Sequence, residues 1–151
     1  SVPSSANAFE ILAKKGADKN VALVGHFPWA ERLSTIAKTL WVIEQNPAEG
    51  DLTEDAATEV LPKADIIGIT GTSLINHTFQ NLAELGRRSL MIMIGPSTPL
   101  SPVLFDWGVD IVCGARVVQA SQAIHAIGQG ATFRQIPGVQ YVNFARRPNM
   151  L

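Results

Sequence analysis

The sequence has a single cysteine, Cys113, so it cannot contain an internal disulfide or a cysteine-rich zinc cluster. It also lacks an excess of charge of either sign, because 12 Lys and Arg residues stand against 13 Asp and Glu residues, for a formal net charge of -1. A chain this close to neutral has no strong long-range attraction for nucleic acid or for an anionic membrane. We therefore expect no nucleic-acid or membrane partner. The lone cysteine fits the reducing cytoplasm.

The sequence also lacks long apolar runs, and we expect no secretory leader. The longest apolar runs, such as 90–95, are far shorter than the roughly 20 residues that a membrane-spanning helix needs. The first residues have neither the basic segment nor the long apolar segment of a signal peptide. We expect a soluble, cytoplasmic protein. Its 151 residues, 46% of them apolar, suffice for one domain with a substantial core.

Short apolar segments alternate with amphipathic segments along the chain. A helix is predicted over 7–15, ending at Gly16, and apolar runs typical of buried strands follow it, separated by stretches with helical spacing. The predicted strands are 20–25, 40–44, 65–70, 90–95 and 109–113, and the predicted helices between them are 29–39, 53–61, 76–85 and 101–107. A further helix at 119–129 and a terminal strand at 139–144 complete the pattern.

The predicted strands are apolar throughout, which indicates a sheet covered by helices on both faces. Strands joined by helices pair in parallel through right-handed crossovers. The predicted fold is therefore a three-layer α/β/α Rossmann-like domain with a mainly parallel sheet of five or six strands. This domain occupies 20–151, and 1–19 form an N-terminal helix or linker. Two strand orders are usual for such a sheet. We favour 2-1-3-4-5, because only one short helix separates the second predicted strand from the third.

In an open parallel sheet, ligands bind beyond the carboxyl ends of the strands, where the strand order reverses. The first predicted strand ends in Gly25-His26-Phe27-Pro28. Gly25 allows a sharp turn and a close approach of the backbone to a ligand, and Pro28 presets the φ angle for the start of the next helix. His26 at the rim could be a proton donor, a proton acceptor or a metal ligand. It could equally be a residue whose hydrogen bonds fix the turn.

An acidic loop follows the second predicted strand. Glu44 stands where comparable sheets hold a ribose with a carboxylate, although the chain lacks the G-x-G-x-x-G pattern of a usual pyrophosphate site. Glu44, Glu49 and Asp51 together could hold a cation, or they could form a solvated turn closed by Gly50.

Hydroxyl-rich loops follow the third and fourth predicted strands. The segments 70–73 and 95–99 place hydroxyls and backbone amides at predicted helix starts, which suits a carboxylate or phosphate. Ordinary N-capping by Ser73 and Ser101 explains part of this content. The chain has no G-x-S-x-G elbow and no metal-ligand spacing, and Cys113 in the last buried strand is expected to be structural.

These loops, taken together, resemble the C-terminal domain of the putative heavy-metal chelation family of uncharacterised proteins. The segments that carry the resemblance are 24–28, 44–51, 70–76, 95–105 and 108–110, and the likeness covers roughly 20–144. The resemblance implies a Rossmann-like domain that follows a smaller domain similar to the N-terminal domain of enolase, with the active site in the cleft between them. Residues 1–15 are too few for that first domain. We expect a fragment of a two-domain protein or a variant that receives the domain in trans, and self-association could replace the missing cover.

The resemblance also implies a set of site residues. The residues at matching motif positions are Gly25, His26, Phe27, Pro28, Glu44, Gly50, Asp51, Thr70, Thr72, Asn76, Ser97 and Thr98. Gly95, which ends the fourth predicted strand, belongs with these candidate ligand-binding residues.

Three functions fit these residues, all with small-molecule partners. In the first, the chain binds a metal ion, a metal chelate or a small anionic ligand. His26, with Glu44 or Asp51, contacts a divalent or heavy-metal ion, while Ser97 and Thr98 hold an anionic group. In the second, His26 is the general acid or base of a small-molecule enzyme. In the third, the chain is a nucleotide- or S-adenosylmethionine-binding module that holds a ribose through Glu44.

Overall fold

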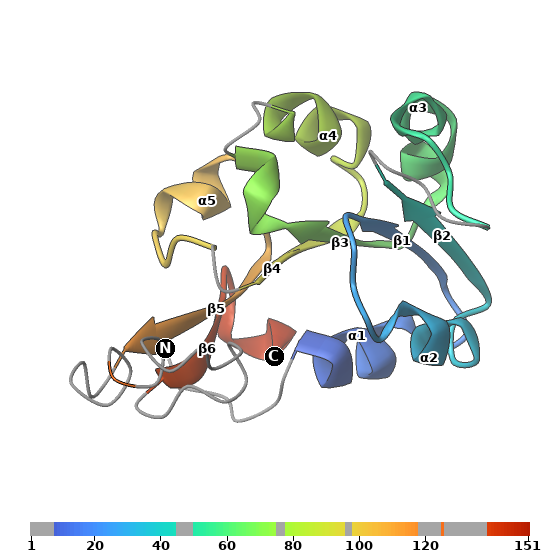
Figure 1. Ribbon diagram of the computed structural model, residues 1–151. Helices are drawn as coiled ribbons and strands as arrows, with labels where there is room; N and C mark the ends of the chain where they lie inside the picture. The colour runs from blue at the N-terminus through green and yellow to red at the C-terminus, as the bar shows by residue number, and fades with distance from the viewer. Residues whose placement is uncertain (1–7, 45–49, 75–77, 96–97, 118–124, 126–138) are drawn as a thin grey trace.

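The computed structural model describes residues 8–44, 50–74, 78–95, 98–117, 125 and 139–151 (Figure 1). The described helices are α1 (Ala8–Gly16), α2 (Ala30–Ser34), α3 (Ala57–Val60), α4 (Phe79–Leu85) and α5 (Val103–Asp106). The strands are β1 (Asn20–Val24), β2 (Thr39–Ile43), β3 (Ile66–Thr70), β4 (Leu90–Ile94), β5 (Ile111–Val117) and β6 (Val139–Ala145). Short 3₁₀ turns lie at 54–56, 61–63, 71–74 and 148–150.

The six strands form one sheet in the order β2-β1-β3-β4-β5-β6. The first five strands are parallel, and β6 runs antiparallel to β5 along its whole length. The predicted order 2-1-3-4-5 is confirmed. The strand order reverses between β1 and β3, because the chain continues from β1 to β2 on one side and from β3 to β5 on the other.

Apolar side chains cover both faces of the sheet. Helices α3, α4 and α5 lie on one face and α1 and α2 on the other (Figure 1). Within β3, Ile67 and Ile69 belong to the core under α3, α4 and α5, and Ile66 belongs to the core under α1 and α2. Leu12 of α1 and Leu33 of α2 are fully buried in this second core. The burial of each side chain contributes about 1.5–3 kcal/mol to the stability of the fold. The predicted three-layer α/β/α fold is confirmed.

Several helices are shorter than their sequence patterns predict. Helix α2 covers 5 residues of the predicted 29–39, and α5 covers 4 residues of 101–107. The hydroxyls of Ser34 and Thr35 donate to carbonyls one turn back, and Ala37 then pairs with Ala17, so the chain leaves the helix there. The predicted helix 119–129 falls, apart from one residue, outside the described residues. In the part of the chain that the structure describes, no helix is long and apolar enough to cross a membrane.

Two aspartates fix the register of the strands at the amino edge of the sheet. Asp65, just before β3, donates its N–H to the carbonyl of Asn20 in β1 (2.8 Å), and its carboxylate accepts the N–H of Asn20 (2.9 Å). Asp110, just before β5, makes the same pair of bonds with Met91 in β4 (2.8 and 2.9 Å). Each aspartate therefore satisfies both backbone groups of one residue on a neighbouring strand. The aligned registers bring the carboxyl ends of the strands level with one another.

Removal of the Asp110 carboxylate is predicted to destabilise the domain. In Asp110→Ala the part-buried N–H of Met91 loses its acceptor, and we expect the free energy of unfolding to fall by about 1–3 kcal/mol. The matched control is Asp106→Ala, which removes an exposed carboxylate nearby and should change stability by less than about 0.5 kcal/mol. Urea unfolding of both variants measures the difference. Equal midpoints would contradict the register role of Asp110.

Candidate functional site

Glycines end two of the parallel strands at the carboxyl edge. Gly25 follows β1 with a φ of 117°, and its N–H donates to the carbonyl of Ile43 in β2 (2.9 Å). Gly95 follows β4 with a φ of 129° and donates to Cys113 in β5 (3.1 Å). A Cβ at Gly25 would lie 2.7 Å from Cγ2 of Thr70, so the ends of β1 and β3 approach because this side chain is absent. Gly25 thus makes the sharp turn that the sequence predicted.

The loop after β4 rests directly on two further glycines. A Cβ at Gly71 would lie 2.9 Å from both the Cα and the backbone nitrogen of Thr98. A Cβ at Gly114 would lie 2.7 Å from Cδ2 of Leu100 and 3.2 Å from the carbonyl oxygen of Thr98. Gly71 and Gly114 were not among the predicted site residues. In the sequence each of them is only a glycine that follows a predicted strand. The loop that contacts both of them, at Thr98 and Leu100, is distant from Gly71 in the sequence, so the contact is not visible there.

Three threonine side chains lie around Gly71. The hydroxyls of Thr70 and Thr72, on either side of this glycine in the chain, are 3.2 Å apart. Thr98, packed over Gly71, is only 4% exposed, and its hydroxyl has no hydrogen-bond partner among the described residues. A buried hydroxyl without a partner costs about 1–3 kcal/mol. The predicted candidates Thr70, Thr72 and Thr98 are therefore brought together at the end of β3.

The residues after Gly25 divide between the rim and the core. His26 is exposed and makes no hydrogen bond or ion pair with another described residue. Phe27 is 8% exposed and stacks on Trp29 with ring centroids 4.9 Å apart, so its ring belongs to the core. Pro28 lies in a turn before α2, which begins at Ala30, so the prediction that Pro28 starts the helix is wrong. The N–H of Ala30 closes this turn by bonding to the carbonyl of Phe27 (3.0 Å).

The acidic loop folds back onto β2. The N–H of Glu44 donates to Leu52 (2.9 Å), and the N–H of Leu52 donates to Val42 (2.7 Å). Glu44 and Asp51 are both half-buried, and Gly50 turns the chain with a φ of 89°. Since the β1 and β2 registers match Val24 with Ile43, the next residues, Gly25 and Glu44, lie side by side at the carboxyl edge.

The predicted metal ligands are not assembled in this structure. Among the residues that the structure describes, no three His, Cys, Asp or Glu side chains are grouped so that they could hold a metal ion. His26, Glu44 and Asp51 therefore do not form a three-ligand site. Backbone hydrogen bonds tie Glu44 and Leu52 together and Leu52 to β2, whereas His26 follows β1 and is exposed. The described donor set does not fit a metal held by the protein alone.

Two candidates cannot be placed, and one capping prediction fails. Asn76 and Ser97 lie outside the described residues. Ser73 does not cap α4, which begins after Thr78, because Ser73 is buried in the preceding 3₁₀ turn. Ser101 behaves more as predicted, since its hydroxyl accepts the N–H of Val103, the first residue of α5 (3.4 Å).

Cys113 is buried in β5, in agreement with its predicted structural role. Burial disfavours the thiolate and raises the pKa of the Cys113 thiol to about 12. The thiol is therefore a weak nucleophile at neutral pH.

The reactivity of Cys113 should report unfolding. We expect a colorimetric disulfide reagent at pH 8 to react with the folded protein at least tenfold more slowly than with the protein in guanidinium chloride. The unfolded thiol ionises near its ordinary pKa of 9.0, whereas the folded thiol stays protonated to about 12. The protein should therefore lose stability as the pH rises from 9 to 12. In Cys113→Ala the cysteine's part of that loss should disappear, and an unchanged pH profile would contradict this account.

A side chain at Gly25 should separate the ends of β1 and β3. In Gly25→Ala the positive φ costs roughly 1–2 kcal/mol, and the contact with Thr70 adds roughly 1–3 kcal/mol. Gly108→Ala is the matched control, since Gly108 has a φ of 104° with nothing within 4 Å of the added Cβ. Thermal unfolding should show a larger loss for Gly25→Ala. Equal losses would mean that the approach of Thr70 is unimportant.

The fold and the edge together define a class of protein. A doubly wound parallel sheet, with a glycine turn after β1 where its strand order reverses, is a Rossmann-like domain. The model of the DUF364 family, described as putative heavy-metal chelation, matches residues 7–145. The chain therefore belongs to this family, and the resemblance that the loops predicted is confirmed.

Related proteins agree with this assignment. A DUF364 protein of unknown function from Desulfitobacterium hafniense DCB-2 is 31% identical, with a TM-score of 0.79 over 89% of this chain and 56% of that one. Another, from Pyrococcus horikoshii, is 17% identical, with a TM-score of 0.81 over 95% and 60%. The uncharacterized protein MJ0500 of Methanocaldococcus jannaschii is 26% identical over 125 residues, 78% of this chain and 48% of that protein. This chain thus spans roughly half the length of these relatives.

Proposed function

We propose that this chain binds a small anionic molecule, such as the carboxylates of an organic metal chelator, at the carboxyl edge of β1, β3 and β4. The observation that carries the proposal is the hydroxyl of Thr98, which is buried over Gly71 without a hydrogen-bond partner among the described residues. Buried hydroxyls in folded proteins nearly always have a partner. A ligand oxygen that reaches this hydroxyl through a small movement of the loop would supply one.

The surroundings of Thr98 suit an oxyanion. The hydroxyls of Thr70 and Thr72 lie on either side of Gly71 and share a hydrogen bond, so the pair can offer one hydroxyl proton to the same ligand. Glycines at the strand ends leave the backbone open to close approach. The acidic residues Glu44 and Asp51 follow β2, at the other side of β1 from β3, so they do not stand among these hydroxyls.

A metal would then enter the site already bound by its chelator. No three-ligand group exists among the described side chains, so the protein would contact the chelator's oxygens and leave most of the coordination to the chelator. Binding of a metal chelate is consistent both with the family's description as putative heavy-metal chelation and with the lack of a three-ligand metal site among the described residues. It requires no protein ligand that the structure lacks.

A second candidate is a ribose-bearing ligand at Glu44. The observation that favours it is the register of β1 and β2, which sets the half-buried Glu44 beside the turn at Gly25. A carboxylate in this place on the second strand of a doubly wound sheet can accept hydrogen bonds from ribose hydroxyls.

The Thr98 hydroxyl is predicted to be needed for binding and unfavourable for stability. Citrate at one hundred times its Kd should stabilise the protein by about 2.7 kcal/mol, a rise of roughly 5–10 °C in Tm. Thr98→Val keeps the shape and removes the hydroxyl. We expect its Tm without ligand to be unchanged or higher, while the rise with citrate is lost. Thr58→Val, at an exposed helical threonine, is the matched control and should keep the full rise.

The same thermal measurement separates the alternatives. A rise in Tm with a free divalent metal, but none with citrate or its metal complex, would contradict the proposal that the protein binds a chelator. A rise with adenosine monophosphate or S-adenosylmethionine that is lost in Glu44→Gln and kept in Thr98→Val would favour the ribose site instead. No rise with any of these compounds would contradict both candidates.

A further inference from the structure

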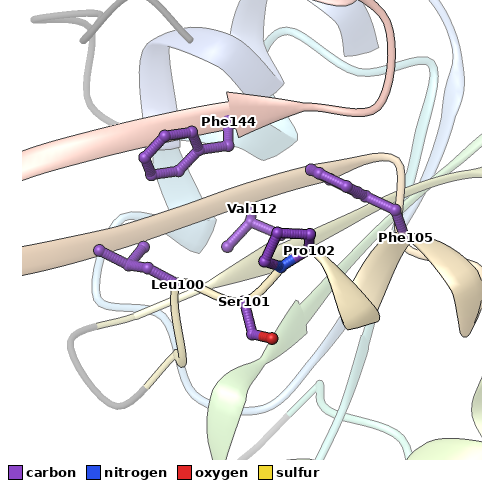
Figure 2. A pocket seen from close by; sticks show the side chains of 6 residues that line it. All are labelled: Leu100, Ser101, Pro102, Phe105, Val112 and Phe144. Atoms are coloured by element: carbon purple, nitrogen blue, oxygen red, sulfur yellow. The ribbon is translucent and has the colours of Figure 1, made fainter.

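An apolar hollow lies next to the proposed anion site, and we infer that it binds an aromatic ring of the ligand. The hollow has a volume of about 80 Å³ and is lined by Leu100, Ser101, Pro102, Phe105, Val112 and Phe144 (Figure 2). The inference that the hollow binds a ring depends only on the residues that line it. The identification of the ligand as an aromatic carboxylate rests also on the proposed function.

Separate elements form the floor and the walls of the hollow. Val112 of β5 and Phe144 of β6 are cross-strand partners. Leu100 and Pro102 come from the loop after β4, and Phe105 comes from α5. In Figure 2, Val112 and Pro102 lie between Leu100 on one side and Phe105 on the other, with the ring of Phe144 above them.

Both walls are held in place without a ligand. Leu100 rests on Gly114, where a Cβ would lie only 2.7 Å from its Cδ2, so its position depends on the bare backbone of β5. The carbonyl of Phe105 accepts a hydrogen bond from the guanidinium of Arg146, whose Nη1 is also 3.8 Å from the carboxylate of Asp110. A pocket whose walls are already fixed loses little conformational entropy on binding.

The lining favours a flat, uncharged group. Ser101 is the single polar residue of the lining, and its hydroxyl accepts the N–H of Val103 and points away from both phenyl rings in Figure 2. The rings of Phe105 and Phe144 and the pyrrolidine of Pro102 offer faces and edges that pack well against another ring. A volume of about 80 Å³ is well below that of a pocket that encloses a whole drug-sized ligand, so the hollow has room for one ring of a ligand and not for a long chain.

The hollow and the anion site share one loop. Leu100 lines the hollow, and Thr98, two residues earlier, carries the partnerless hydroxyl. The side chain of Leu100 and the carbonyl of Thr98 both lie over Gly114. One molecule can therefore place its ring in the hollow and its carboxylate toward Thr98. Aromatic carboxylates that chelate metals, the salicylates among them, have this combination of groups.

Titration with three probes tests the inference. Salicylate carries both a ring and a carboxylate, benzyl alcohol carries only the ring, and cyclohexanecarboxylate carries a saturated ring with the same anion. Protein NMR titrations should give the lowest Kd for salicylate, with cyclohexanecarboxylate at least fivefold weaker. Leu100→Trp, which fills the hollow from its rim, should weaken salicylate and benzyl alcohol at least tenfold. Val103→Trp is the matched control at a similarly exposed residue outside the lining, 40% against 37% exposed, and should leave both Kd values within twofold.

Each alternative outcome would contradict one part of the inference or of the proposed function. Failure of salicylate and benzyl alcohol to bind would overturn the ring site, and equal Kd values for salicylate and cyclohexanecarboxylate would overturn its preference for aromatic rings. A wild-type dimer that Leu100→Trp converts to a monomer in sedimentation would make the hollow an interface between copies. If benzyl alcohol binds and Thr98→Val leaves salicylate binding unchanged, the ring site stands and the proposed anion site fails. Intermolecular NOEs from salicylate ring protons to the Val112 methyls of the wild-type protein test the location without any variant.

Discussion

The contact of the β4 loop with bare backbone at Gly71 and Gly114 determines the geometry of the whole carboxyl edge. Because neither residue has a Cβ, Thr98 lies directly on the backbone after β3 and Leu100 on the middle of β5. This contact buries the Thr98 hydroxyl and sets the Leu100 wall of the apolar hollow. Side chains at these glycines would lift the loop and separate the two features. The polar and the apolar parts of the edge therefore depend on the same backbone contact.

The amino edge controls the same geometry from the other end of the strands. Asp65 and Asp110 each bond both backbone groups of a residue on a neighbouring strand, so the strands cannot slip relative to one another. In a parallel sheet a slip of one residue would turn every core side chain to the opposite face. The register that buries Ile67 and Ile69 in one core and Ile66 in the other also brings the strand ends together.

The fold could be predicted from the sequence because its signals are local. Apolar runs such as 66–70 and 90–94 have the length and composition of buried parallel strands, and the helical stretches between them dictate parallel crossovers. Helix ends were less predictable. The spacing over 29–39 continues past Ser34, but side-chain hydroxyls that bond back to the chain compete with the helix there.

The candidate site could be predicted only where one residue carries the signal. Gly25 is such a case, since a glycine at a strand end predicts its own turn. Phe27 looked like a ligand-binding residue because it belongs to the same motif, yet its ring stacks on Trp29 in the core. The contact of Gly71 with Thr98 joins loops that follow different strands, and no local pattern reveals it. The grouping of carboxylates is likewise a tertiary property, which is why the three predicted metal ligands looked compatible in sequence.

The antiparallel pairing of β6 has a consequence for the apolar hollow. Four of the five strand pairings of the sheet join the five parallel strands to one another. Phe144 reaches Val112 only through the pairing of β6 with β5. The Phe144 side of the apolar hollow therefore depends on this antiparallel pairing, and not on the parallel pairings that bring the other strand ends together. Fraying of β6 would remove Phe144 from the hollow without breaking any pairing among β1 to β5.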